Sequence, residues 1–91
     1  MALSIHFRPK SMNAAKYKEV LDRLDRAGAG SPAGRLHHIS FGSGDDLEVI
    51  DVWDSQASFE KFGATLGPIL AELGVDPGDP VIKPVHNIIA G

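Results

Sequence analysis

Apolar residues recur along this chain with two periods, and the shorter period is that of β-strands. Residues 3–7 form an apolar-rich run that ends before Pro9, which cannot donate a backbone hydrogen bond to a sheet. Residues 36–41 and 47–53 are rich in β-branched and aromatic side chains, and a polar, glycine-bearing connection of hairpin length separates them. These runs predict three strands, of which the second and third pair antiparallel.

A first stretch of helical periodicity follows the first strand. Its apolar side chains fall at positions i, i+3, i+4 and i+7, on one face of a helix; they are Tyr17, Val20, Leu21 and Leu24. Asn13 can cap the amino end of this helix, and Gly28 can end it by adopting a left-handed backbone conformation. The pattern predicts an amphipathic helix from about residue 14 to residue 27.

A second helix and a last strand complete the pattern. The helix can be capped by Asp54 or Ser55, and its apolar positions are Phe59, Phe62, Leu66, Ile69, Leu70 and Leu73. The pair Gly67-Pro68 should kink or split it, because proline lacks the amide proton that a helix needs. Residues 81–89 predict a final strand, which Pro84 places at a sheet edge or a bulge.

The order of elements predicts the fold class. Strand, helix, strand, strand, helix, strand is the βαββαβ succession of a ferredoxin-like α+β fold, with two helices on one face of a four-stranded antiparallel sheet. With 91 residues the chain fits one domain, 1–91, and is too short for two.

Apolar residues in both phases of the strands indicate a homodimer. The strand at 47–53 carries Ile50 and Val52 on one face and Val49 and Trp53 on the other. Helices cover only one face, so the other would expose an apolar patch that monomers rarely carry. A symmetric pair of sheets removes it; the alternative is scattered single exposures, which are normal on protein surfaces.

Charge and composition limit the kinds of partner that the protein can bind. A net charge of -3 and scattered Lys and Arg residues give no basic field for nucleic acid. The chain has no cysteine, which excludes disulfides and thiolate chemistry. No run approaches the roughly 20 apolar residues of a membrane helix, and the amino terminus does not resemble a signal peptide. We therefore expect a cytoplasmic protein with no nucleic-acid or membrane partner.

The junction from Val52 to Phe62, with the sequence VWDSQASFEKF, resembles the strand-to-helix junction of the dimeric α/β-barrel superfamily. That superfamily includes antibiotic-biosynthesis monooxygenases and heme-degrading monooxygenases. In the heme-degrading members an asparagine on the first strand, and a tryptophan and a histidine on the second helix, build the pocket. Their counterparts here are His6, Phe62 and no histidine, so the resemblance disfavours heme degradation. A cofactor-independent oxygenase remains compatible with the resemblance, and we expect no cofactor.

Histidines and one acidic residue are the candidates for chemistry. His6, His38 and Asp51 are candidate catalytic residues, because imidazole can act as an acid or a base near neutral pH and a half-buried carboxylate can orient it. The alternative for Asp51 is a salt bridge at a rim or a dimer interface. His37 and His38 point to opposite faces of their strand, so we expect no metal site.

Trp53, Phe62 and His86 are candidate ligand-pocket residues. Aromatic side chains can line an apolar cavity between sheet and helices, although at these spacings they more often form plain core. A pocket that combines His6, His38 and His86 depends on a strand register that the sequence does not define.

Two functions follow from these observations. The first is a small dimeric barrel protein that binds a small apolar organic molecule and acts as a cofactor-independent monooxygenase-like enzyme, as the resemblance implies. The alternative is a non-catalytic metabolite-binding, structural or regulatory dimer of the same fold.

Overall fold

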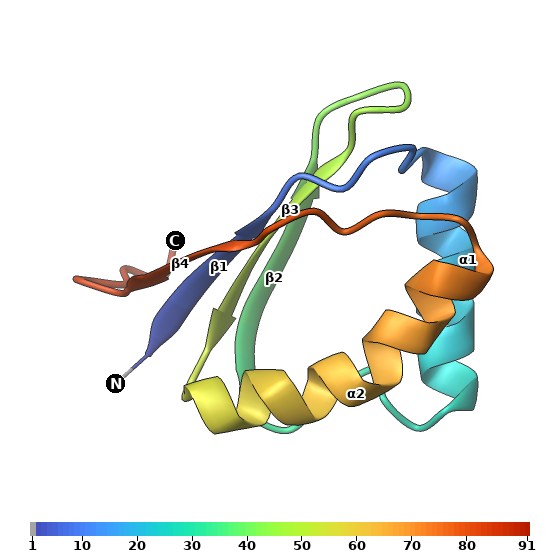
Figure 1. The fold of residues 1–91 in the computed structure, drawn as a ribbon. Helices are drawn as coiled ribbons and strands as arrows, with labels where there is room; N and C mark the ends of the chain where they lie inside the picture. The colour runs from blue at the N-terminus through green and yellow to red at the C-terminus, as the bar shows by residue number, and fades with distance from the viewer. Residues whose placement is uncertain (1) are drawn as a thin grey trace.

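The computed structural model describes residues 2–91 and has the predicted order of elements (Figure 1). In chain order these are β1 (Leu3–Phe7), α1 (Ala14–Arg26), β2 (Arg35–Phe41), β3 (Glu48–Trp53), α2 (Gln56–Glu72) and β4 (Val81–Pro84). The four strands form one antiparallel sheet in the order β2-β3-β1-β4. The predicted α+β, ferredoxin-like fold class is confirmed.

The last strand is shorter than the sequence predicts. Residues 81–89 were expected to be extended in the sheet, but β4 ends at Pro84. In the antiparallel register Pro84 lies opposite Leu3, the first residue of β1, so the chain beyond it has passed the end of its neighbour. One further backbone bond joins the Val85 amide to the carbonyl of Ala2, at 2.9 Å. The edge position predicted from Pro84 is correct, because β4 borders β1 alone.

Both helices begin at the predicted caps. The side chain of Asn13 accepts a hydrogen bond from the amide of Lys16 at 2.9 Å, and that of Ser55 accepts one from Ser58 at 3.2 Å. Each cap satisfies an amide that has no partner within its helix. Pro68 lies inside α2 without splitting it, and Figure 1 shows α2 changing direction in its second half.

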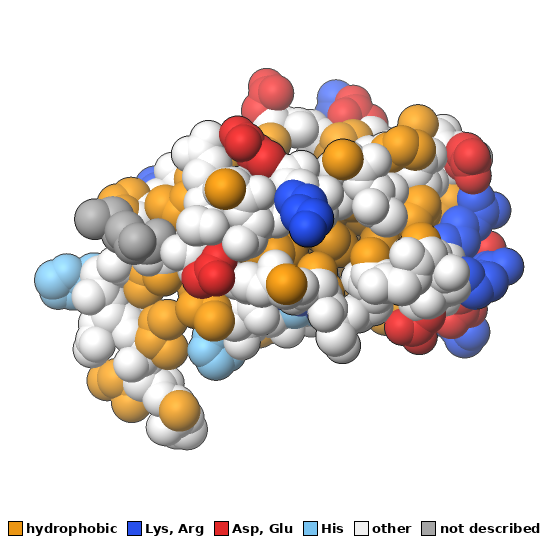
Figure 2. Space-filling view, turned by 90° about the horizontal axis from the view of Figure 1, so that it is seen from below, with side chains coloured by type: hydrophobic (Ala, Val, Ile, Leu, Met, Phe, Trp, Pro, Cys, Tyr) orange, Lys and Arg blue, Asp and Glu red, His pale blue; other side chains and the backbone are white. Residues whose placement is uncertain are grey.

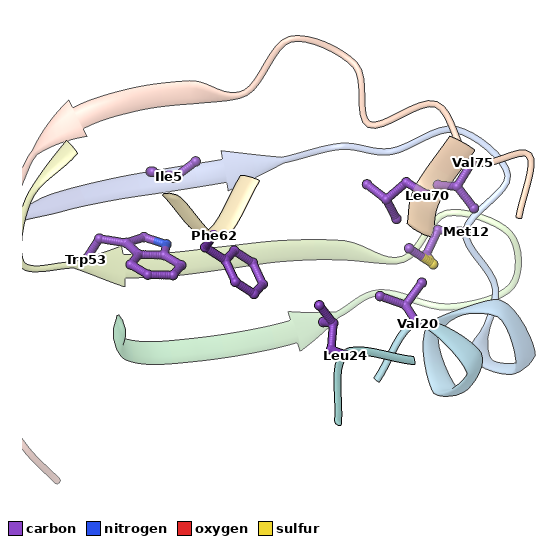
Figure 3. Close-up of a cluster of buried hydrophobic side chains, with 8 residues drawn as sticks. All are labelled: Ile5, Met12, Val20, Leu24, Trp53, Phe62, Leu70 and Val75. Carbon is purple, nitrogen blue, oxygen red and sulfur yellow. The ribbon is translucent and has the colours of Figure 1, made fainter. Parts of the chain in front are cut away.

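The two helices cover one face of the sheet (Figure 1), and the core lies between the helices and that face. Ile5 and Trp53 are fully buried there. Figure 3 shows Trp53 beside Phe62 at one end of the core, and Leu70 beside Val75 at the other. Neither helix of residues 2–91 combines the length and apolar character of a membrane span.

Neither helix of the described residues covers the second face of the sheet, which keeps apolar side chains at its surface. Ile39 and Phe41 of β2 are 57% and 37% exposed, and Val81 of β4 is 51% exposed. Figure 2, which views the molecule from the side of α2, shows charged side chains gathered at the α1 end. Hydrophobic and histidine side chains gather at the opposite end, where the chain termini lie (Figures 1 and 2).

Candidate functional site

Three side chains from three elements form a continuous hydrogen-bonded line on the helix-covered face. The register of β2 and β3 places His38 opposite Asp51, and Nδ1 of His38 lies 2.5 Å from Oδ1 of Asp51. The other ring nitrogen, Nε2, lies 2.6 Å from the phenol oxygen of Tyr17 on α1. The line therefore runs from a buried carboxylate through an imidazole to a phenol.

The hydrogen-bond pattern defines which groups donate. The Asp51 side chain is only 4% exposed, and as a carboxylate it accepts the proton of His38 Nδ1. His38 Nε2 then carries a lone pair and accepts the O–H of Tyr17. In this tautomer each of the two hydrogen bonds joins one donor to one acceptor, as buried polar groups require.

The environment of Tyr17 favours its neutral form. Burial raises the pKa of the Tyr17 phenol above its usual value of 10.0. The Ser40 side chain and the positive charge of Arg35 act in the opposite direction, and the negative charge of Asp51 adds to the rise. At neutral pH the phenol is thus a hydrogen-bond donor to His38 rather than a phenolate.

A small cavity adjoins the line. It has a volume of about 60 Å³ and lies between the sheet and both helices. Its wall is almost entirely apolar, with Leu24 from α1 and Phe62, Leu66 and Leu70 from α2. Tyr17, His38, Asp51 and Arg35 supply its polar groups. An apolar cavity with a few convergent polar groups is the usual form of a small-molecule site.

A bulge in β2 brings Arg35 into this cavity. Arg35 lies opposite Trp53, and His37 lies opposite Val52, so Leu36 is an extra residue without a partner on β3. Without the extra residue, alternation from His38 would turn residue 35 to the uncovered face. Instead Arg35 lines the cavity, with its guanidinium carbon 5.8 Å from the centre of the Phe62 ring.

His6 lies on the opposite face of the sheet from this site. Ile5 points into the core, and the neighbouring His6 pairs with Ile50 on the uncovered face. Its Nε2 is 2.8 Å from a carboxylate oxygen of Glu48, which also bonds Arg8 at 3.2 Å. His6 and His38 therefore do not share a cavity.

The predicted pocket residues are distributed between wall, core and surface. Phe62 lines the cavity. Trp53 is fully buried against Phe59 and Phe62, outside the cavity wall, and its indole N–H has no hydrogen-bond partner among residues 2–91. His86 lies beyond β4 and is exposed. Of the predicted site residues, His38, Asp51 and Phe62 line the cavity, Trp53 packs against Phe62 outside it, and His6 and His86 lie elsewhere.

Sequence reasoning missed Tyr17 and Arg35 as site residues. Tyr17 was placed in the buried stripe of the first helix, and a signal was present, because a buried phenol needs a hydrogen-bond partner. For Arg35 there was no local signal, since the bulge depends on how β2 pairs with β3. Within residues 2–91 no group of three or more His, Asp or Glu side chains is placed to hold a metal ion.

No protein-family model matches this chain, and no curated protein matches it in sequence. Several solved structures match it in fold. The structure is similar to SnoaB, a cofactor-independent oxygenase from Streptomyces nogalater, at 18% identity and a TM-score of 0.68, covering 99% of this chain and 98% of SnoaB. It is also similar to a protein from Chloroflexus aurantiacus J-10-fl that is assigned as an antibiotic biosynthesis monooxygenase. The identity is 16%, the TM-score is 0.65, and the match covers 100% of each chain.

A protein from Caulobacter crescentus CB15 with the same assignment has 17% identity and a TM-score of 0.57, with 97% of this chain and 89% of that chain covered. At these identities the likeness is one of fold. The chain has the ferredoxin-like fold of the antibiotic-biosynthesis-monooxygenase-like proteins, and the resemblance inferred from residues 52–62 is confirmed at that level.

Proposed function

We propose that this protein binds a small, largely apolar organic molecule in the cavity between sheet and helices, and removes a proton from it as the first step of a cofactor-independent oxygenation. The observation that carries the proposal is the line Tyr17–His38–Asp51, which ends at the wall of an apolar cavity. The fold shared with SnoaB supports the same chemistry.

The line can move a proton without a cofactor. A ligand O–H placed against the Tyr17 oxygen passes its proton to the phenol, while the phenol proton passes to His38 Nε2. His38 then carries the proton as an imidazolium, and the Asp51 carboxylate balances its charge. The raised pKa of Tyr17 fits this role, because the phenol returns to its neutral form once the proton has passed.

A phenolic probe tests both binding and chemistry. Loss of its O–H proton makes 1-naphthol electron-rich at the para carbon, where dioxygen can add. One oxygen atom then enters 1,4-naphthoquinone and the other leaves as water. We expect 1-naphthol to raise the melting temperature of the protein, since a ligand that binds the native state stabilises it. We also expect protein-dependent oxygen uptake that matches quinone formation one to one.

The alternative is a non-catalytic dimer of the same fold that binds a metabolite or serves a structural or regulatory role, and the small cavity favours the structural or regulatory role. About 60 Å³ holds only a handful of water molecules, so a bicyclic ligand has to displace the cavity wall. A raised melting temperature without oxygen uptake would support this alternative. If 1-naphthol at millimolar concentration produces neither effect, both catalysis and ligand binding in this cavity are contradicted, and the structural or regulatory role is left.

We further propose that the protein is a homodimer that associates through the uncovered face of its sheet. Exposed Ile39, Phe41 and Val81 support this, together with half-buried Ile50 and Val52 on the same face. In such a dimer the pair His6–Glu48 would be an interface contact rather than a catalytic one. Sedimentation velocity at micromolar concentration tests it, and a monomer would contradict it. The cytoplasm stays its expected location.

A further inference from the structure

We propose that Arg35 recognises a negative charge on the ligand, so that the cavity selects organic anions, or molecules that become anions there, over neutral molecules of the same shape. This inference rests on the proposed function, because it assigns a ligand class to the same cavity. It starts from the bulge of β2, which turns a charged side chain toward an apolar cavity.

Arg35 is held in place by its surroundings rather than by an opposite charge. Its guanidinium Nη2 donates to the carbonyl of Gly30 at 3.3 Å, and the guanidinium lies over the Phe62 ring. Among residues 2–91 no carboxylate lies within ion-pair distance of it. A half-buried guanidinium with one long neutral hydrogen bond keeps several N–H donors for another acceptor.

The backbone before Arg35 is also tightly placed. Gly34 has a φ of +91°, and an added Cβ there would lie 2.5 Å from the Ser58 side chain at the start of α2. The carbonyl of Gly34 accepts the amide of Asp54 at 2.8 Å. These contacts anchor the start of β2 to the start of α2, and so they fix the backbone from which the Arg35 side chain extends toward Gly30 and Phe62.

Arg35 also lies on the boundary between inside and outside. Arg35 and His38 line both the internal cavity and a surface depression at the edge of β2, whose other walls include Ser31, Pro32 and His37. A ligand that enters through this depression meets both the guanidinium and His38 on its way into the cavity. Its apolar body can pass into the cavity while its charged group stays at the boundary with Arg35.

The charges of the site agree with an anionic ligand. In the resting site the positive charge of Arg35 and the negative charge of Asp51 offset one another. When His38 takes a proton from the ligand, the site gains one positive charge and the ligand one negative charge. A ligand oxyanion then lies in a cavity whose net charge is opposite to its own, and Arg35 is the group that distinguishes it from a neutral molecule.

The test uses two probes of equal shape, 2-naphthoate and neutral 2-naphthamide, in isothermal titration with the full chain at pH 7.5. We expect the wild type to bind naphthoate more tightly than naphthamide. We expect Arg35→Gln to weaken naphthoate binding by at least about tenfold and to leave naphthamide binding within about twofold. Retained naphthamide binding also shows that the variant is folded.

The matched control is Arg26→Gln, which removes the same charge from the exposed end of α1 and should change neither affinity by more than about twofold. Equal affinity of the wild type for the two probes, or an equal effect of Arg35→Gln on both, would overturn the role of Arg35 while leaving the cavity as a ligand site. If neither probe binds the wild type, the ligand site itself is wrong, and the role of Arg35 with it.

Discussion

Residues 2–91 contain two histidine–carboxylate pairs, one on each face of the same sheet. His38 bonds Asp51 at 2.5 Å on the helix-covered face, and His6 bonds Glu48 at 2.8 Å on the uncovered face. The Asp51 side chain is 4% exposed, whereas that of Glu48 is 31% exposed. The two pairs thus contain the same chemical groups in different surroundings.

The surroundings decide what each pair can do. His38 Nε2 is engaged by the Tyr17 phenol beside an apolar cavity, so a proton taken up at one end of the line is balanced at the other. The Glu48 carboxylate is shared with Arg8, whose side chain is 78% exposed, and solvent screens the interaction. We therefore expect the first pair to serve chemistry and the second to serve the surface or an interface.

The largest difference between the two faces should appear in activity. We expect His38→Ala to slow protein-dependent oxygenation of 1-naphthol by about 10²–10⁴-fold, because it removes the proton acceptor of the line. The matched variant His6→Ala should stay within about threefold, since His6 lies outside the cavity. Initial rates of oxygen uptake give both values, and circular dichroism checks the fold. A larger loss in His6→Ala would reverse the assignment of the two faces.

Association should depend on the uncovered face alone. We expect Ile39→Asp to raise the dimer dissociation constant by about 100-fold or more, because each subunit would bury an unpaired carboxylate in the interface. Ala71→Asp, an exposed position on α2, is the control and should leave it unchanged. Sedimentation velocity over a concentration series measures both. Unchanged association of Ile39→Asp would show that this face is not the interface.

The two carboxylates should differ in how much each contributes to the free energy of unfolding. We expect Asp51→Ala to lower the free energy of unfolding by about 1–3 kcal/mol, because it leaves the Nδ1 proton of a half-buried imidazole without an acceptor. Glu48→Ala should cost less, about 1 kcal/mol or below, because the side chains of His6 and Glu48 are 28% and 31% exposed and solvent screens their interaction more than that of the buried Asp51. Urea denaturation at pH 7 compares them. Equal losses would mean that burial does not distinguish the pairs.

The smallest effect should be a change in how stability depends on pH. Below about pH 10 the Tyr17 phenol is protonated in both folded and unfolded chains, so its contribution is fully present. Above that pH the unfolded chain ionises first, because burial raises the folded pKa, and stability falls. We expect the free energy of unfolding of the wild type to decline more steeply above pH 10 than that of Tyr17→Phe. Parallel declines would show that Tyr17 titrates normally.

The position of His6 shows that strand periodicity can predict which face of the sheet a side chain lies on. In β1 the apolar residues Leu3, Ile5 and Phe7 alternate with Ser4 and His6, so the pattern already indicated that the histidine faces away from the core. The sequence left open a pocket shared by His6 and His38, although the alternation within residues 3–7 already favoured opposite sides for His6 and the core. The site assignments of His38 and Asp51 stay predictions about chemistry, although the structure places the two side chains in contact.

The sequence by itself determined the succession of elements, the helix caps and the apolar stripes, because periodicity, Asn13, Ser55 and proline act over a few residues. Only the tertiary structure decided that Tyr17 meets His38, and that an extra residue in β2 turns Arg35 into the cavity. These contacts join residues far apart in the chain or depend on strand register, and neither is a property of any local segment.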